Sequence, residues 1–416
     1  MTTAETDAPV KFDPFEEGYT EWPYAQYARL RRADSVHYSD LLQAWVLTRY
    51  ADVDRVLKDP SMSSDIDNAT PTPITEMEIQ RRGEVEQGHA DPLPLLDEPD
   101  HTRVRRLIAP TFRKGSVKNL NETIERHVSV LLDGIVERHG PSGTFDMVSE
   151  FAYPMPVMVI CELMGVPEED GPEFRTWVQY VALGLDPFIS AEQRERSLQA
   201  GEEMREYLRQ QVAAKRGTPT DDLTSELAAA SEDGEQLSAD ELILQLQTLY
   251  IAGHEPVTAV LGNGFRGLFE QPDQLQMLRD DPSLLEHAVL ELLRYDGPNQ
   301  FVRRIAMQDL HFDGGTIPAG AVIYPGIAAA NHDPEEFGED GDQIRVDRPS
   351  AAHHLQLGAG IHACLGTHLA KLESEIAIRR LLERFPKMEL VAPPTWANRM
   401  VLRSVNELHV RYDLAG

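Results

Sequence analysis

The sequence has very few cysteines and no long apolar segment. Only Cys161 and Cys364 occur among 416 residues, which excludes the disulfide framework that stabilises many small secreted proteins. No uninterrupted apolar run reaches the roughly 18 residues of a membrane-spanning helix. The N-terminal stretch is polar and acidic and lacks the basic and apolar regions of a secretory signal. We therefore expect a cytoplasmic protein.

Positive charge is also scarce. Lysine and arginine number 39 against 69 aspartates and glutamates, which gives a formal net charge of −30 at pH 7. Such a chain is repelled by nucleic acid and by anionic membranes, so neither is an expected partner. One local basic cluster departs from this composition, made of Arg103, Arg105, Arg106, Arg113, Lys114 and Lys118.

Helical periodicity dominates the sequence. Amphipathic helices are predicted over 117–138, 155–164, 191–215, 239–269, 283–295 and 364–384. The longest of these, 239–269, is apolar on several faces and is expected to be a central, buried helix.

Strand patterns are short and come from both ends of the sequence. They cover 45–50, 301–306, the turn-rich segment 308–326 and the tail 404–414. Two long loops are predicted, 60–97 and 331–356. No Gly/Ser or Pro linker divides the chain, so we predict one domain over 1–416, mainly α with small β-sheets.

The two cysteines have different surroundings. Cys161 lies in an apolar run and is expected to be a small buried core residue. Cys364 is flanked by Gly358, Gly360 and Gly366, which permit positive φ and a close backbone approach to a flat ligand. A helical pattern follows Cys364, so the thiol is expected at a helix N-terminus, where its pKa would be lowered.

Three roles are open for Cys364 from its own surroundings. It could be a structural cysteine, a nucleophile with His362 or His368 as base, or a metal ligand. Zinc would require further ligands at regular spacing. Haem ligation is favoured, because a cysteine thiolate is an established axial ligand of haem iron.

The cysteine motif resembles the haem-binding loop of the bacterial soluble cytochrome P450 family. The pattern G-x-G-x-H-x-C-x-G-x-x-L-A is matched by Gly358, Gly360, His362, Cys364, Gly366, Leu369 and Ala370. Leu357 and Lys371 stand where the family usually has phenylalanine and arginine. The resemblance implies haem b, with the Cys364 thiolate as the axial ligand of iron and Gly366 in the cofactor loop. It also implies the P450 fold, a triangular helical prism with haem between the 239–269 helix and the cysteine-loop helix.

Glu291 and Arg294 lie three residues apart on a predicted helix and therefore share a face. An isolated pair of this kind is usually a surface ion pair. The resemblance implies instead that Arg348 joins the pair in a structural charge network near the cysteine.

His101 and Arg105 lie one helical turn apart. They could form a solvated basic face, or they could bind a carboxylate such as a haem propionate. The resemblance favours propionate binding and adds Arg304 and His362 as further contacts, with Arg303 as a competitor for the role of Arg304.

The segment 249–258 resembles the family's oxygen-binding helix. Ala252, Gly253 and Glu255 match its small residues and its acid, but Pro256 occupies the position of the usual threonine. Proline has no N–H, so the carbonyl of Ala252 loses its helical partner and could hold a water. Thr258 is a poor replacement for the missing hydroxyl, because it lies on a different face. Proton delivery is therefore expected to depend on Glu255, water or substrate.

The resemblance also implies a substrate pocket, with contributions from the 75–96 and 174–190 segments. Its single residues are Leu249, Ala252, Gly253, Asn299, Gln300, Phe301, Val302, Met400 and Val401. Most are apolar, and the amides of Asn299 and Gln300 are expected to offer polar contacts. A mid-sized, mainly apolar substrate follows.

The implied function is a haem-thiolate monooxygenase that uses O2, with a place in natural-product or antibiotic biosynthesis. Hydroxylation is the default reaction, and Pro256 favours a variant outcome such as C–C coupling, desaturation or epoxidation. The sequence ends without a reductase domain, so electrons are expected from a separate ferredoxin and its reductase, steered by the basic cluster and Lys371. The alternatives are a peroxide-driven peroxygenase, a non-catalytic haem sensor or ligand-binding protein, and a thiol enzyme without haem.

Overall fold

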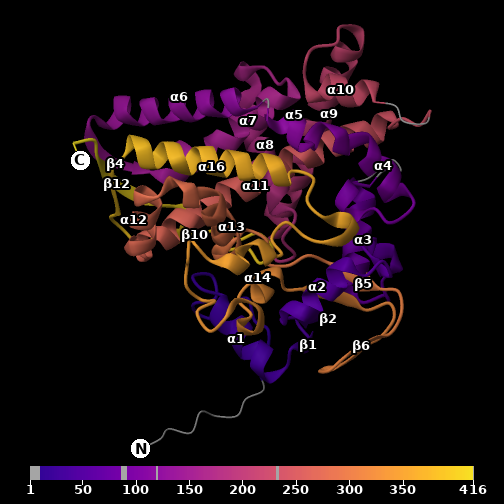
Figure 1. Ribbon diagram of the computed structural model, residues 1–416. Coiled ribbons are helices and arrows are strands. Elements are labelled where there is room, and N and C mark those ends of the chain that lie inside the picture. The colour runs from indigo at the N-terminus through magenta and orange to yellow at the C-terminus, as the bar shows by residue number, and fades with distance from the viewer. Residues whose placement is uncertain (1–9, 86–90, 119, 231–233, 416) are drawn as a thin grey trace, which may run out of the picture.

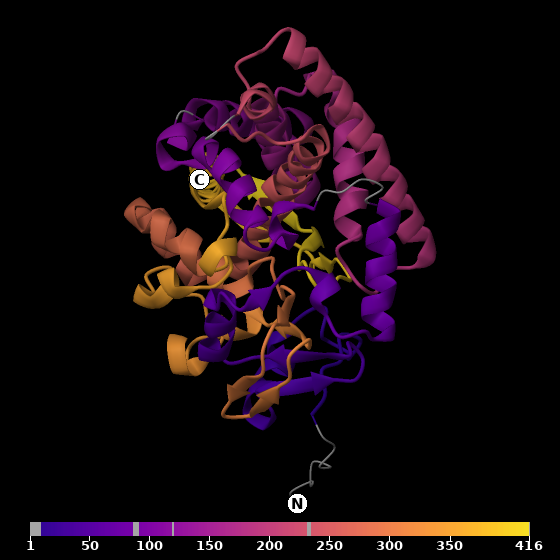
Figure 2. The same cartoon turned by 90° about the vertical axis from the view of Figure 1, so that its right-hand side faces the viewer.

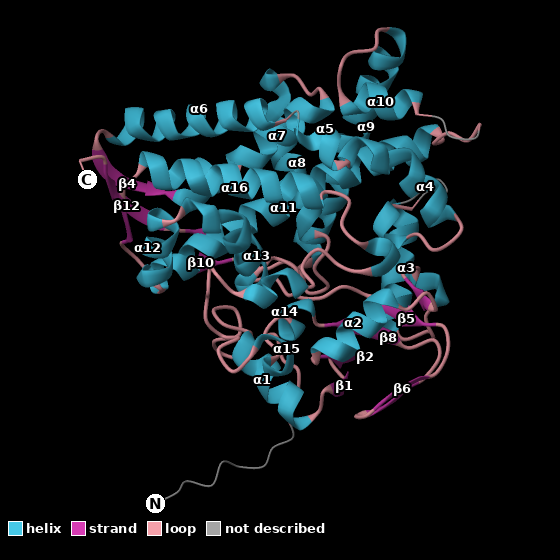
Figure 3. Ribbon diagram, viewed as in Figure 1, coloured by secondary structure: helices cyan, strands magenta, loops and turns pink. Residues whose placement is uncertain are grey.

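Helices form most of the molecule, and strands gather at two of its edges (Figure 3). The structure is a computed structural model that describes residues 10–85, 91–118, 120–230 and 234–415. Within these residues, no helix is both long and apolar enough to cross a membrane. The predicted class, mainly α with small sheets, is confirmed.

Helix α11 (Ala239–Glu270) is the central element. It begins with a capping box, in which Ser238 accepts from the amide of Glu241 and Glu241 accepts from the amide of Ser238. Most of its side chains beyond residue 256 are buried. Gly264 lets α13 (Leu285–Asp296) approach closely, because an added Cβ would lie 2.9 Å from Leu292. The predicted buried helix over 239–269 is thus confirmed almost to the residue.

Three further helices pack against α11 and form its surroundings: α7 (Pro154–Met164), α9 (Ala191–Gly217) and α16 (Thr367–Arg384). Figure 1 shows α6 (Asn121–His139), α16 and α11 running side by side across the upper half of the molecule. Figure 2 shows α9 along the outer flank. The remaining longer helices are α1 (Tyr24–Ala33), α2 (Tyr50–Lys58), α3 (Pro73–Val85), α4 (Asp100–Ile108), α8 (Gly171–Leu183), α10 (Leu223–Ala229) and α12 (Pro272–Asp280).

The predicted loop over 60–97 is wrong in its middle part. Residues Pro73–Val85 form α3, which begins with proline at its first position. Its sequence is polar on nearly all sides, so no apolar stripe reveals it. The predicted pocket segment 75–96 also includes residues 86–90, which lie outside the described residues.

The largest sheet joins both halves of the chain. Its strand order is β1 (Val36–Ser39), β2 (Ala44–Leu47), β8 (Val322–Pro325), β5 (Arg304–Ala306) and β3 (Met62–Ser63). Only β2 and β8 pair in parallel; the other pairs are antiparallel. This pairing fixes β5, which carries Arg304, beside the N-terminal strands.

The smaller sheets organise the C-terminal part. They are β4 (Ser142–Asp146) with β12 (His409–Asp413) and β9 (Lys387–Leu390), β6 (Leu310–Phe312) with β7 (Gly315–Ile317), and β10 (Thr395–Trp396) with β11 (Val405–Glu407). The last pair closes residues 395–407 into a ribbon, the terminal hairpin, with Met400 and Val401 at its tip.

Candidate functional site

Cys364 lies in a tight loop just before α16. Gly358 and Gly360 both have φ of +68°, and an added Cβ on Gly360 would lie 2.5 Å from the carbonyl oxygen of Leu57. Only glycine suits that position. The amide of Cys364 donates to the carbonyl of Leu357 at 2.8 Å, and the Thr367 hydroxyl donates to the carbonyl of Cys364 at 2.9 Å. These contacts hold the cysteine at the start of the helix.

The Cys364 side chain is exposed, whereas Cys161 is buried. Although the side chain reaches solvent, the surrounding chain desolvates the Cys364 thiol and raises its pKa, and the Gly366 amide, Thr367 and Arg105 only partly oppose this. The predicted lowering of the thiol pKa at the helix N-terminus is therefore wrong for the protein alone. A coordinated metal removes the thiol proton, so an accessible thiol of this kind suits a ligand better than a free nucleophile.

Four nitrogen-bearing side chains converge near the cysteine loop. The rings of His101 and His362 lie 4.5 Å apart, and Arg105 donates to the carbonyl of Ala363 at 2.7 Å. Burial, with help from neighbouring cations, lowers the pKa of His362 to about 3. Burial also lowers the pKa of Arg304 to about 10. Positive charge on these side chains is therefore destabilised, and a bound anion would stabilise it.

Two observations show that this cluster fits a ligand with carboxylates. His101 is 1% exposed, and neither of its ring nitrogens has a partner among the described residues. Buried polar atoms normally have one. Arg303 forms an ion pair with Glu78, whereas the Arg304 guanidinium donates to the carbonyl of Arg303. Arg303 is therefore engaged elsewhere, and Arg304 is left for the site.

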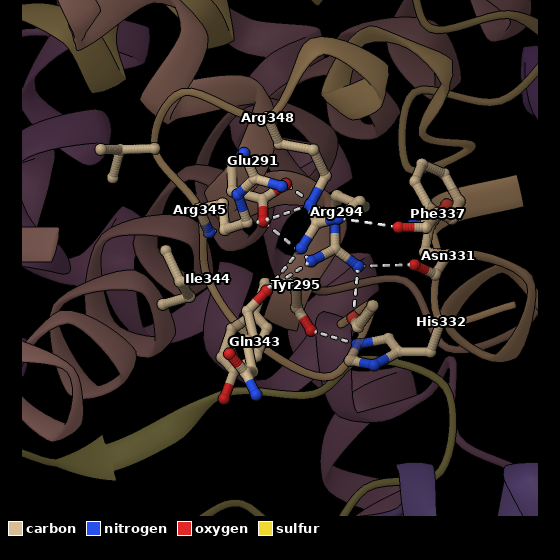
Figure 4. Close-up of polar contacts among 12 residues, drawn as sticks. Glu291, Arg294, Tyr295, Asn331, His332, Phe337, Gln343, Ile344, Arg345 and Arg348 are labelled. Atoms are coloured by element: carbon tan, nitrogen blue, oxygen red, sulfur yellow. Dashed lines mark hydrogen bonds and ion pairs between the residues drawn. The ribbon is translucent and has the colours of Figure 1, made fainter. Parts of the chain in front are cut away.

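Glu291, Arg294 and Arg348 come together in a fully buried network (Figure 4). Arg294 binds both carboxylate oxygens of Glu291, at 2.7 and 2.9 Å, and Arg348 Nε donates to Glu291 Oε1 at 3.0 Å. Arg294 also donates to the carbonyl of Asn331 at 2.8 Å, and the Asn331 side chain accepts from the amide of Leu355 at 2.8 Å. The network thereby braces the segment that leads into the cysteine loop.

One face of α11 is open in the middle of the helix. Ala252 is exposed, and Leu249 and Pro256 are half-buried. Spacings of three and four residues place these three side chains on one face. Gly253 borders this face, and an added Cβ there would lie 3.0 Å from Ile160. The result is an accessible, apolar strip on the central helix.

The polar groups of this segment are engaged at its sides. Glu255 forms an ion pair with Arg399 of the terminal hairpin at 2.8 Å. The Thr258 hydroxyl is buried and donates to the carbonyl of His254 at 3.1 Å. Thr258 is therefore held away from the open strip, as its position relative to Pro256 predicts.

The comparisons with known proteins agree with this geometry. The family model for cytochrome P450 matches residues 46–407. The chain belongs to the cytochrome P450 family. It is 37% identical to cytochrome P450 107B1 of Saccharopolyspora erythraea over 99% of both chains. It is 35% identical to 6-deoxyerythronolide B hydroxylase of the same organism, over 95% of this chain and 97% of the relative.

Solved P450 structures show the same fold. The bacillaene polyketide synthase P450 PksS of Bacillus subtilis has a TM-score of 0.87 with this chain at 33% identity, covering 97% of this chain and 100% of its own. The protein is thus a P450 monooxygenase whose cofactor is a thiolate-ligated haem.

In this P450, Cys364 would hold the iron, and His101, Arg105, Arg304 and His362 would hold the propionates. When bound, haem supplies iron-centred oxidation by dioxygen. Gly366 lies beside the sulfur, because an added Cβ there would be in van der Waals contact with the Cys364 Sγ at 3.9 Å.

The predicted pocket residues divide into two groups. Leu249, Val302 and Val401 are partly accessible. Phe301 is 1% exposed and packs at right angles to Tyr27 in a core cluster. Met400 is also buried.

The expectation of free amides at Asn299 and Gln300 does not hold. The Asn299 amide donates to the carbonyl of Gln356 at 3.1 Å, and Gln300 accepts from the Tyr27 hydroxyl at 3.0 Å and donates to the carbonyl of Gly297 at 3.3 Å. The Asn299 NH2 group and both ends of the Gln300 amide therefore brace the protein itself.

Sequence reasoning missed two residues that support the site. Ser64 lies 3.1 Å from His362 Nε2, and Arg399 binds Glu255. Each partner is distant in sequence, and no spacing pattern connects them.

Proposed function

We propose that this P450 inserts oxygen into a mid-sized, mainly apolar natural product, in the cytoplasm and with electrons from a separate ferredoxin. The observation that carries the proposal is the open, apolar strip on α11 formed by Leu249, Ala252 and Pro256. Apolar walls with few polar groups favour ligands of the same character. Relatives named for polyketide pathways support a substrate of that class. Hydroxylation is the proposed default outcome.

The proposed electron donor is a small acidic ferredoxin. Arg106, Arg113 and Lys114 are exposed, and α5 (Lys114–Lys118) packs against α16, the helix that follows the cysteine. In a chain with net charge −30, this basic patch would steer an acidic partner to the cysteine side. Lys371 and Arg103 contribute less, because Arg103 is paired with Glu241 and Lys371 lies 3.8 Å from Glu286.

The experiment has two steps. The reduced, carbon-monoxide-bound protein is expected to show the red-shifted absorption of a thiolate-ligated haem. Turnover of apolar polyketide-type substrates, first selected by their shift of the ferric spin state, is then measured with ferredoxin, reductase and NADPH. Absence of the red-shifted band, or of turnover by any substrate that shifts the spin state, would contradict the proposal.

A peroxide-driven reaction is the alternative that the same assay separates. Arg399 binds Glu255, the residue that precedes Pro256. A free arginine at this place could bind a carboxylate or peroxide. The charge of Arg399 is paired with the Glu255 carboxylate, so Arg399 is not free to anchor a substrate carboxylate or peroxide. We expect hydrogen peroxide to support turnover more slowly than the ferredoxin system.

A further inference from the structure

Asp186 is a buried carboxylate in the α8–α9 connection, residues 184–190. It is 6% exposed. Its Oδ1 accepts from the amide of Phe188 at 3.0 Å. Its Oδ2 accepts from the amides of Met400, in a short contact, and Val401, at 3.4 Å. One side chain therefore joins this connection to the tip of the terminal hairpin.

The hairpin tip is fixed on its other side by backbone contacts. The amide of Gln300 donates to the carbonyl of Val401 at 2.9 Å. Lower down, Arg403 binds the buried Asp296 at 2.7 Å, and its amide donates to the carbonyl of Pro298 at 2.8 Å. The hairpin base is thus tied to the end of α13, and Asp186 ties the tip to the α8–α9 connection.

The α8–α9 connection has few other anchors. Phe188 packs against Phe15 with ring centroids 5.1 Å apart, and Ser190 caps α9 through Gln193. Leu185, next to Asp186, is 53% exposed. Phe188 also packs against the core cluster to which Met400 belongs, so an apolar contact accompanies the hydrogen bonds of Asp186.

We propose that Asp186 is a positioning residue that makes the α8–α9 connection and the hairpin tip move as one unit, and thereby sets which ligand sizes reach the open strip of α11. The size-selecting part rests on the proposed function, since it requires that the tip lines a ligand pocket. The coupling itself stands on the three amide contacts alone.

A carboxylate is required at this position for a chemical reason. Both oxygens of Asp186 accept hydrogen bonds from backbone amides, and a carboxylate offers only acceptors to these donors. Asparagine keeps one acceptor but turns an NH2 group toward an N–H donor. Asp186→Asn therefore breaks one side of the link with almost no change in volume.

Asp146 offers a matched control. Its carboxylate also accepts from three amides, those of Val148 at 3.2 Å, Ser149 at 3.1 Å and Leu408 at 2.8 Å. It too joins an earlier segment of the chain to the C-terminal part, at Leu408, but away from the tip of the terminal hairpin. Asp146→Asn removes the same kind of contact without touching Met400 or Val401.

The first test is hydrogen exchange on the full-length, haem-loaded protein and both variants. Asp186→Asn is expected to speed exchange by about tenfold on the side that its NH2 group faces, either at Phe188 or at both Met400 and Val401, since a charge-assisted hydrogen bond is lost there. Asp146→Asn should leave those amides unchanged and speed exchange near Leu408. Unchanged exchange on both sides of the link in Asp186→Asn, or equal acceleration at the tip in both variants, would overturn the coupling.

The second test uses two azoles as probes, imidazole and a bulky triphenylmethyl-imidazole, titrated by absorption. Asp186→Asn is expected to change the Kd of the bulky azole by about fivefold and that of imidazole by less than about twofold. An equal change for both azoles, or for neither, would overturn the size selection. Failure of the proposed function is distinguishable, because it would appear as absence of turnover by spin-shifting substrates, while the exchange experiment still tests the coupling.

Discussion

Two carboxylates on opposite sides of the site differ in how they are held. On the cysteine side, Glu291 is fully buried and is bound by two arginines. On the α11 side, Glu255 is bound by Arg399 at 2.8 Å, and its side chain is 11% exposed. The first carboxylate also accepts from the amide of Arg345 at 2.9 Å. Buried, multiply bonded charges resist rearrangement, because losing one partner strands the others in a low dielectric. The cysteine side is therefore built to stay fixed, and the α11 side can adjust to a ligand.

Removing the second arginine of the cysteine side should give the largest effect. Arg348→Ala leaves the Glu291–Arg294 pair without its outer partner and is expected to cost up to about 5 kcal/mol of unfolding free energy. Haem content should fall with it, since Arg294 and Asn331 brace the cysteine loop. Both quantities are measured by urea unfolding and by the haem-to-protein ratio.

Arg345 provides the control for this change. It lies in the same loop, and its side chain is 44% exposed with partners Asp340 and Asp347. Arg345→Ala should lower stability by less than about 1 kcal/mol. Similar losses in the two variants would mean that the buried network is no more important than a surface pair.

A second buried network allows a sharper comparison. Asp296, also on α13, is bound by Arg403 at 2.7 Å, Arg266 at 3.0 Å and the Tyr24 hydroxyl at 2.8 Å. Asp296→Asn should cost about 3 kcal/mol of unfolding free energy, yet leave the haem content near that of wild type, because this network holds the terminal hairpin. An equal loss of haem from Asp296→Asn and Arg348→Ala would show that the two buried networks do not differ in their effect on haem binding.

The contribution of Asp296 to the free energy of unfolding should also depend on pH. Burial raises the pKa of Asp296, but Arg403 and Arg266 outweigh it and hold the pKa below its usual value. A depressed folded pKa gives stability that is complete above the unfolded pKa of about 4 and is lost as the pH falls toward the folded value. Asp296→Asn should therefore show a shallower loss of stability below about pH 4 than wild type. Identical acid profiles would contradict this assignment.

Arg304 and Arg303 form a natural pair for testing the propionate cluster. Arg304→Gln should speed haem transfer to apomyoglobin by about tenfold, because a charge-assisted contact is lost. Arg303→Gln should change it little, since Arg303 binds Glu78. The reverse order would assign the propionate contact to Arg303.

The smallest effect is expected on the α11 side. Pro256→Thr restores an N–H and adds a hydroxyl beside the open strip, which should change the fraction of reducing equivalents lost as hydrogen peroxide by about twofold. The measurement compares NADPH consumed, peroxide formed and product formed. Equal coupling in the two proteins would show that proton delivery does not depend on residue 256.

The parts of the protein that could be predicted are those encoded over short spacings. The central helix, predicted over 239–269, spans Ala239–Glu270 because its apolar pattern and its Ser238 cap are local signals. Cys364 is recognisable from its loop for the same reason. The predicted lowering of the thiol pKa is wrong, because desolvation outweighs the hydrogen bonds at the helix start and the charge of Arg105.

Contacts between distant residues were the part that sequence could not supply. Arg399 and Glu255 are 144 positions apart, and Arg403 and Asp296 are 107 apart. Gln300 was expected at the pocket, but Tyr27, 273 positions away, takes up its amide oxygen. Only the folded chain shows which of several candidate polar groups already have a hydrogen-bond partner within the protein.

The tip of the terminal hairpin is held through its main chain, by the amides of Met400 and Val401 and the carbonyl of Val401. The tether is therefore indifferent to the side chains at these two positions, apart from proline, which has no N–H. Met400 is restricted by its packing in the core, whereas the half-buried Val401 can be replaced by other side chains without loss of the tether. This difference marks Val401, and not Met400, as the first position to randomise when variants with altered substrate preference are sought.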